Sequence, residues 1–156
     1  MNHKKDIYKI LSIAFILDQI IKLLVMKLIH ENQIITVIPN FFFLTFVKNT
    51  GAAFSILEGK QLLLIMISVI FIIMINEYLK REENLKTLTV ISYGLILGGV
   101  FGNLLDRIIH KSVIDFLSFK IFGYSFPIFN FADMCITIGI LLLIIDIIKE
   151  KEKELK

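Results

Sequence analysis

Long apolar runs with few polar interruptions dominate the pattern along this chain. Four of them stand out, at residues 7–29, 62–79, 88–105 and 130–148. Because an α-helix rises 1.5 Å per residue, crossing the roughly 30 Å apolar core of a bilayer takes about 20 residues. The pattern therefore predicts a mainly α polytopic membrane protein with four transmembrane helices, arranged as one membrane-embedded domain over residues 1–156.

The first apolar run follows Lys4 and Lys5, as the apolar part of a secretory signal peptide would. It is longer than such a segment, is interrupted by Asp18, Gln19 and Lys22, and has no cleavage site of small residues. We therefore expect the first run to remain in the protein as a transmembrane helix.

Segments 30–61 and 106–129 show a different pattern. A turn signal, Pro39-Asn40, separates two runs rich in β-branched and aromatic residues, and residues 113–129 form a similar stretch that is broken at Gly123. These features predict a small β-rich extracytoplasmic element on the outer membrane surface. It could cover the helix ends for a functional reason or only pack against them.

Basic residues give the orientation of the predicted helices. Lysine and arginine are concentrated in the N-terminal arm, in residues 80–87 and in the C-terminal tail. Loops rich in these residues stay in the cytoplasm. Both termini and the 80–87 loop are therefore expected to be cytoplasmic, with segments 30–61 and 106–129 facing outward.

Composition removes several other classes of protein. Hydrophobic residues make up 56% of the 156 residues, the mean hydropathy is +0.80 and the net charge is only +3. A water-soluble enzyme would be less apolar than this chain. A nucleic-acid-binding protein would be more basic. Cys135 is the only cysteine and the three histidines are scattered. We therefore expect no internal disulfide, no metal site and no cofactor.

Ionisable residues inside a membrane span are costly, about 2.5–3.5 kcal/mol each, so each one needs a reason. Asp18 and Lys22 are spaced i, i+4 with the acid first, which is the favourable order for an ion pair on one helix. They could form a purely structural pair, or they could bind substrate.

Asp106 and Asp133 lie about 27 Å and about 23 Å from the cytoplasmic ends of the third and fourth predicted helices. Both are therefore expected near the outer membrane boundary, where two carboxylates could share one water molecule. Asp133 could instead be only a residue favoured at a helix N-terminus. Asp106 opposes the dipole of its helix end, where Arg107 could pair with it.

Two close carboxyl groups whose environments differ can divide the roles of acid and base. We hypothesise that Asp133 is the base and that Asp106 begins protonated. The alternatives are a transporter or proton relay through Asp18, Lys22, Asp106 and Asp133, and a scaffold in which these residues only join helices. A relay favours polar groups spread through the membrane and repeated halves, which this sequence does not show.

Five short motifs occur in order along the chain. They are Asp18-Gln-Ile-Ile-Lys22, Asn49-Thr-Gly-Ala-Ala-Phe54, Gly102-Asn-Leu-Leu-Asp-Arg107, Val113-Ile-Asp-Phe116 and Phe129-Asn-Phe-Ala-Asp133. On four apolar runs, this set closely resembles the lipoprotein signal peptidase family, also called signal peptidase II. Members are aspartyl endopeptidases of the bacterial cytoplasmic (inner) membrane.

The resemblance implies a function. The chain would remove the signal peptide from a prolipoprotein, cutting just before a cysteine that carries a diacylglyceryl group, at a site near the outer face. Its partners would be the lipid-modified prolipoprotein and membrane lipid, with no nucleic acid, and we expect a monomer.

The resemblance also implies residue roles. The catalytic dyad of the family falls on Asp106 and Asp133. The supporting positions fall on Asp18, Lys22, Asn49, Gly51, Asn103, Arg107, Asp115, Asn130 and Ala132. From the residues alone, Gly51, Ala52 and Ala53 would keep a loop slim enough for substrate to approach, and Phe54 would suit a lid or lipid-facing element.

Overall fold

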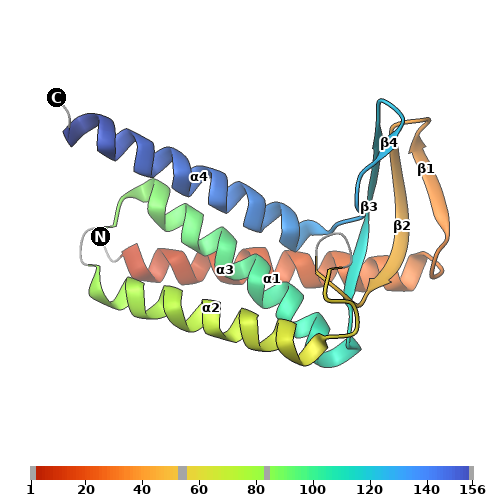
Figure 1. The fold of residues 1–156 in the computed structure, drawn as a ribbon, viewed down its shortest axis with the longest axis horizontal. Coiled ribbons are helices and arrows are strands. Elements are labelled where there is room, and N and C mark those ends of the chain that lie inside the picture. The colour runs from red at the N-terminus through yellow and green to blue at the C-terminus, as the bar shows by residue number, and fades with distance from the viewer. Residues whose placement is uncertain (1–2, 53–55, 83–84, 155–156) are drawn as a thin grey trace.

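Four helices lie side by side, and a small sheet covers one end of them (Figure 1). This computed structural model describes residues 3–52, 56–82 and 85–154, so Ala53 and Phe54 lie outside the described residues. The helices are α1 (His3–Leu28), α2 (Gln61–Arg81), α3 (Thr87–His110) and α4 (Phe131–Glu154). Helix α3 packs against the other three, and α1 begins and α4 ends at the end opposite the sheet.

Helices α2, α3 and α4 have the length and apolar composition needed to cross a membrane. Three of the four predicted spans therefore correspond to helices suited to that role. Helix α1 has 26 residues, but its apolar stretch contains Asp18 and Lys22 and is bounded by Lys9 and Lys27. Its crossing of the membrane stays a prediction.

Close packing of α1 against α3 depends on a stripe of glycines that the sequence prediction did not use. Gly94, Gly98 and Gly102 are spaced four residues apart and so share one face of α3. A Cβ atom on Gly98 would lie 2.7 Å from Ala14 Cβ, and one on Gly102 would lie 3.0 Å from Asp18 Cγ. Small residues at this spacing let two helix backbones approach closely. The stripe thereby brings Asp18 against α3.

The sheet confirms the predicted β-rich element. Its strands pair antiparallel in the order β1-β2-β3-β4, and they are β1 (Ile34–Ile38), β2 (Phe42–Asn49), β3 (Val113–Ile121) and β4 (Tyr124–Ser125). The first turn places Asn40 at φ 59°, and the second places Gly123 at φ 82°. Glycine and asparagine are the residues that tolerate this left-handed conformation best.

A hydrophobic cluster fixes the sheet to the helices. Val25 and Ile29 at the end of α1 pack with Phe46 of β2 and with Ile114 and Phe116 of β3. The strands consequently run across the helix direction at the end of the bundle (Figure 1). Strand β3 begins three residues after α3 ends, so its first residues lie close to the end of α3.

Candidate active site

The end of α3, the start of β3 and the N-terminus of α4 meet around a cavity of about 370 Å³. Asp115 and Asp133 both line it, together with Asn49, Asn103 and Arg107. Two carboxyl groups, two amides and a guanidinium therefore surround one space. Apolar side chains of α3 and α4 complete its wall.

Asp133 is fixed by the way α4 begins. Its backbone N–H donates to Asn130 Oδ1 at 3.0 Å, and the Asn130 N–H donates to Asp133 Oδ2 at 3.1 Å. This reciprocal pair is a capping box, which satisfies donors that a helix N-terminus leaves free. Asn103 Nδ2 donates to the other carboxylate oxygen of Asp133 at 2.8 Å. Asp133 is thus both the helix-terminal residue considered above and a carboxylate held rigidly at a cavity.

Asp115 stands on β3, opposite Val47 of β2, and its side chain is buried. Asn130 Nδ2 donates to Asp115 Oδ1 at 2.7 Å, and Asn49 Nδ2 donates to Oδ2 at 2.8 Å. Burial, followed by the negative charge of Asp133, raises the pKa of Asp115 to about 7. The pKa of Asp115 thus lies near neutral pH, where its carboxyl group can hold or release a proton.

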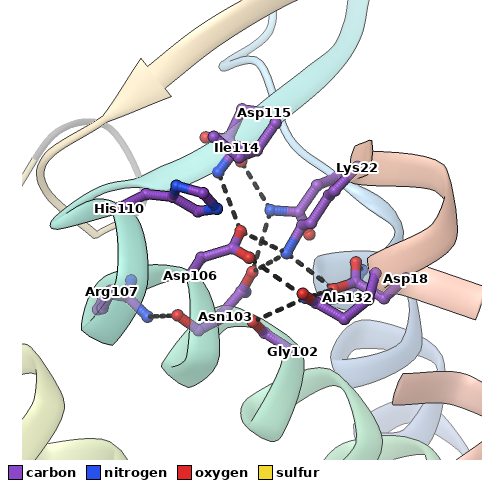
Figure 2. A network of polar contacts seen from close by, with 12 residues as sticks. Asp18, Lys22, Gly102, Asn103, Asp106, Arg107, His110, Ile114, Asp115 and Ala132 are labelled. Carbon is purple, nitrogen blue, oxygen red and sulfur yellow. Dashed lines mark hydrogen bonds and ion pairs between the residues drawn. The ribbon is translucent and has the colours of Figure 1, made fainter. Parts of the chain in front are cut away.

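A second group of charged side chains lies between α1 and α3 (Figure 2). Lys22 Nζ contacts Asp18 Oδ2 at 2.8 Å, Asp106 Oδ2 at 2.9 Å and Asn103 Oδ1 at 3.0 Å. The ammonium thereby has an acceptor for each of its three hydrogens. Asp18, Lys22 and Asp106 are each at most 2% exposed. The predicted pairing of Asp18 with Lys22 is confirmed, and Asp106 joins it.

The polar contacts of Asp106 are with residues other than Asp133, which disfavours the expected pairing of these two residues. Both Asp106 oxygens accept hydrogen bonds: Oδ1 from Gln19 Nε2 at 3.2 Å, and Oδ2 from the Ile114 N–H at 3.1 Å as well as from Lys22. Among the described residues, Asp106 does not line the cavity. Asp106 lies four residues after Gly102, on the same face of α3, and therefore faces α1 and not the cavity.

The hypothesis that Asp106 begins protonated stays a prediction. Each polar contact that it makes within the described chain comes from a donor. The carboxyl group that shares the cavity with Asp133 and lies next to its charge is Asp115.

Comparison with known proteins bears on what this site does. Residues 10–149 match the family described as Signal peptidase (SPase) II. The chain belongs to the signal peptidase II family. Membership makes it a peptidase and supports the cleavage of lipoprotein signal peptides. It disfavours both the proton relay and the non-enzymatic scaffold.

Two solved structures resemble this signal peptidase II chain closely. Both are described as bacterial membrane enzymes determined by the in meso method, one at 2.3 Å and the other at 1.9 Å resolution. The first has a TM-score of 0.86 and 33% identity, with 92% of this chain and 88% of that one covered. The second has a TM-score of 0.80 and 34% identity, with 90% of each chain covered. The fold is therefore that of known bacterial membrane enzymes over nearly its whole length.

Arg107 provides the positive charge at the peptidase cavity. Its guanidinium donates to the Asn103 carbonyl oxygen at 3.3 Å and to the Gly51 carbonyl oxygen at 3.4 Å. It also interacts electrostatically with Asp133 and Asp115. Its buried Nε has no hydrogen-bond partner among the described residues, so the guanidinium keeps a donor that is not used.

Each residue predicted for the site takes part in one of three groups. Asn49, Gly51, Asn103, Arg107, Asp115 and Asp133 line the cavity; Asp18, Lys22 and Asp106 form the buried ion cluster; Asn130 and Ala132 begin α4. The Ala132 N–H donates to Asp18 Oδ1 at 2.9 Å, which connects the last two groups.

Sequence reasoning missed Gln19 as a site residue. Its Nε2 lies within hydrogen-bond distance of Asp18 Oδ2, Asp106 Oδ1 and the Gly102 carbonyl oxygen, at 3.1, 3.2 and 3.3 Å. Its presence as a polar residue between Asp18 and Lys22 in an apolar run was the available signal.

Proposed function

We propose that this chain is an aspartyl endopeptidase in which Asp115 and Asp133 form the catalytic pair. The observation that supports the pair is that both carboxyl groups line one cavity and interact there, with the charge of Asp133 adding to burial in raising the pKa of Asp115 to about 7. The substrate is a prolipoprotein whose cysteine carries a diacylglyceryl group, and the peptide bond before that cysteine is cut.

The reaction needs one proton shared between the two carboxyl groups. Ionised Asp133 takes a proton from a water molecule as the water oxygen bonds to the scissile carbonyl carbon, and protonated Asp115 gives its proton to the carbonyl oxygen. When the carbon–nitrogen bond breaks, the leaving amine takes the proton from Asp133. A hydroxyl group of the intermediate then returns a proton to Asp115 as the new carboxyl group forms.

Amide groups around Asp115 and Asp133 hold the two carboxyl groups in position. Asn130 donates from its side chain to Asp115 and from its backbone to Asp133, so one residue connects both carboxyl groups. Asn103 and Asn49 hold the remaining carboxylate oxygens. The Arg107 guanidinium lines the cavity and offsets negative charge there.

The proposed site lies at the outer face of a bacterial cytoplasmic membrane, with both termini in the cytoplasm. The cavity is lined by Val100 of α3 and by Ile136 and Thr137 of α4, while its other side meets the sheet. An active site at this depth suits a substrate whose signal peptide is in the bilayer and whose following segment is outside. The enzyme acts as a monomer, with membrane lipid around it and no cofactor.

A cleavage assay tests this proposal. Purified protein would be given a diacylglyceryl-modified prolipoprotein and its unmodified precursor, with cleavage followed by gel mobility. We expect cleavage of the lipidated form only, and a loss of at least about 100-fold in Asp115→Asn and Asp133→Asn because each removes a proton-transfer group.

Asp106→Asn separates the two possible assignments of the pair. We expect the folded fraction of this variant to keep measurable activity, because Asp106 acts through Lys22 and not on substrate. Full activity in Asp115→Asn, together with none in folded Asp106→Asn, would contradict the proposed pair.

A further inference from the structure

Two more cavities follow the active-site cavity along one face of the sheet. Their volumes are about 610 and 440 Å³. The first shares Asn49, Asp115 and Ile128 with the active-site cavity, and the second shares Val47, Ser118 and Ile128 with the first. The three therefore form one groove that runs from Asp115 outward over β2 and β3.

The groove lies on the sheet face opposite α1. Side chains alternate between the two faces of a strand. Phe46 packs toward α1 in the hydrophobic cluster, whereas its neighbours Thr45 and Val47 line the groove. Residues 125–128 form the other wall, and the Phe126 N–H donates to the Phe119 carbonyl oxygen at 2.9 Å. The groove thus begins beside the proposed catalytic pair and follows the sheet.

The two ends of this channel differ in their surroundings. At the membrane end, the active-site cavity is lined by Ser68 of α2, Val100 of α3 and Thr137 of α4, all within helices suited to cross the bilayer. An apolar signal peptide belongs at that end. The chain on the other side of the cut must leave toward water, and the groove over the sheet leads that way.

The groove offers the chemistry of a site for an extended peptide. Its outer part combines apolar Ile34 and Phe43 with polar Thr45 and Ser118, so neighbouring side chains of an extended chain would meet different surroundings. Exposed Lys120 lies at this outer part and has no carboxylate partner among the described residues. Lys48 borders the middle part, but its side chain shares the strand face of Phe46 and is paired with Glu31 at 2.8 Å.

We propose that this groove binds the substrate segment C-terminal to the cut in an extended conformation, and that Lys120 favours an acidic residue at its outer end. The proposal rests on the proposed peptidase function and adds a second binding region to it. Substrate recognition then extends beyond the lipidated cysteine.

Two lipidated substrates, compared on the same enzyme preparation, test the groove. One keeps a long segment after the lipidated cysteine, and the other ends two residues after it. We expect kcat/KM to be at least about fivefold higher for the long substrate in the wild-type protein and in Ser12→Phe, whose exposed position on α1 lies outside the groove. In Ser118→Phe, whose ring fills the groove, this ratio falls to about one. The ratio does not depend on how much of each preparation is folded.

Charge reversal tests the outer end. With long substrates that carry either glutamate or lysine at successive positions, the wild-type protein is expected to prefer glutamate at one outer position by about two- to fivefold, the range of an exposed ion pair. Lys120→Glu inverts this preference. Lys60→Glu, at an exposed lysine just before α2 that does not line the groove, leaves it unchanged.

Each other outcome overturns a specific statement. Equal kcat/KM for long and short substrates in the wild-type protein, or an unchanged ratio in Ser118→Phe, overturns the groove while the peptidase function stands. A preference that Lys120→Glu does not alter overturns the role of Lys120. No cleavage of either substrate by the wild-type protein overturns the peptidase function, and the groove with it.

Discussion

Asp115→Asn is expected to abolish cleavage and yet stabilise the protein at neutral pH. In the folded protein, burial and Asp133 raise the pKa of Asp115 from 3.8 to about 7. A carboxyl group with a raised pKa is stabilising below its unfolded pKa, and this contribution is lost as pH rises through its folded pKa. A shift of about 3 pKa units corresponds to about 4 kcal/mol. Wild-type protein should therefore lose about 3 kcal/mol between pH 4 and pH 7, relative to a variant with no charge at this position.

The substitution introduces one further effect, which does not vary with pH. Both Asp115 oxygens accept a hydrogen bond from an amide, so the NH₂ group introduced by Asp115→Asn would face the NH₂ group of either Asn49 or Asn130. This mismatch costs about 1–3 kcal/mol if no side chain rotates. The test therefore uses the difference in unfolding free energy between Asp115→Asn and the wild-type protein. What decides is how this difference changes with pH, not its value at one pH.

Thermal unfolding in detergent at a series of pH values between 4.5 and 8.5 measures this change. The control is Asp6→Asn, which removes a partly exposed carboxylate near the start of α1. We expect the Tm of Asp115→Asn to rise relative to wild type as pH increases to about 7 and to stay level above it. Parallel curves for the two proteins across the whole range would refute both the raised pKa and its physical cause.

Four more predictions follow from the same contacts. The kcat/KM should fall about tenfold per pH unit above about pH 7, because Asp115 must be protonated to donate; a flat profile to pH 9 contradicts this. Lys22→Met should lose about 3–5 kcal/mol in thermal unfolding, since two buried carboxylates lose their shared cation, and Lys27→Met is the exposed control. Gly98→Leu should destabilise by more than about 1 kcal/mol in the same assay, because even a Cβ there is too close to α1. Asn103→Leu should lower kcat about ten- to hundredfold by removing a hydrogen bond of about 1.5–3 kcal/mol to a charged group, and an unchanged kcat in folded protein would refute its positioning role.

Much of the fold could be predicted because the signals are local. The helices follow from apolar runs, and the turns of the sheet follow from Pro39-Asn40 and Gly123, where the structure has residues in the left-handed region. What sequence reasoning passed over was the glycine spacing of four along α3. That spacing marks the face which packs on α1, and its next member is Asp106.

The site was harder to predict, because depth in the membrane does not fix direction around a helix axis. Counting residues placed Asp106 near the outer end of α3, which agrees with its contact to the N–H of Ile114 at the start of β3. It could not show that Asp106 faces α1 while Asn103 and Arg107 face the cavity. Asp115 reaches the cavity only because the chain reverses after α3, at Lys111 with φ 54°, and pairs with β2.

The start of α4 explains why structural and catalytic residues are so closely joined here. A helix N-terminus has four N–H groups without partners inside the helix, and at membrane depth water is scarce. Asp18 accepts the N–H of Ala132, Asn130 Oδ1 accepts that of Asp133, and Asp133 Oδ2 accepts that of Asn130. Lys22 stabilises Asp18 in this position and also holds Asn103, which binds Asp133. Contacts that complete the helix end therefore also orient the proposed catalytic carboxylate, and we expect the buried ion cluster to affect catalysis through position and not through proton transfer.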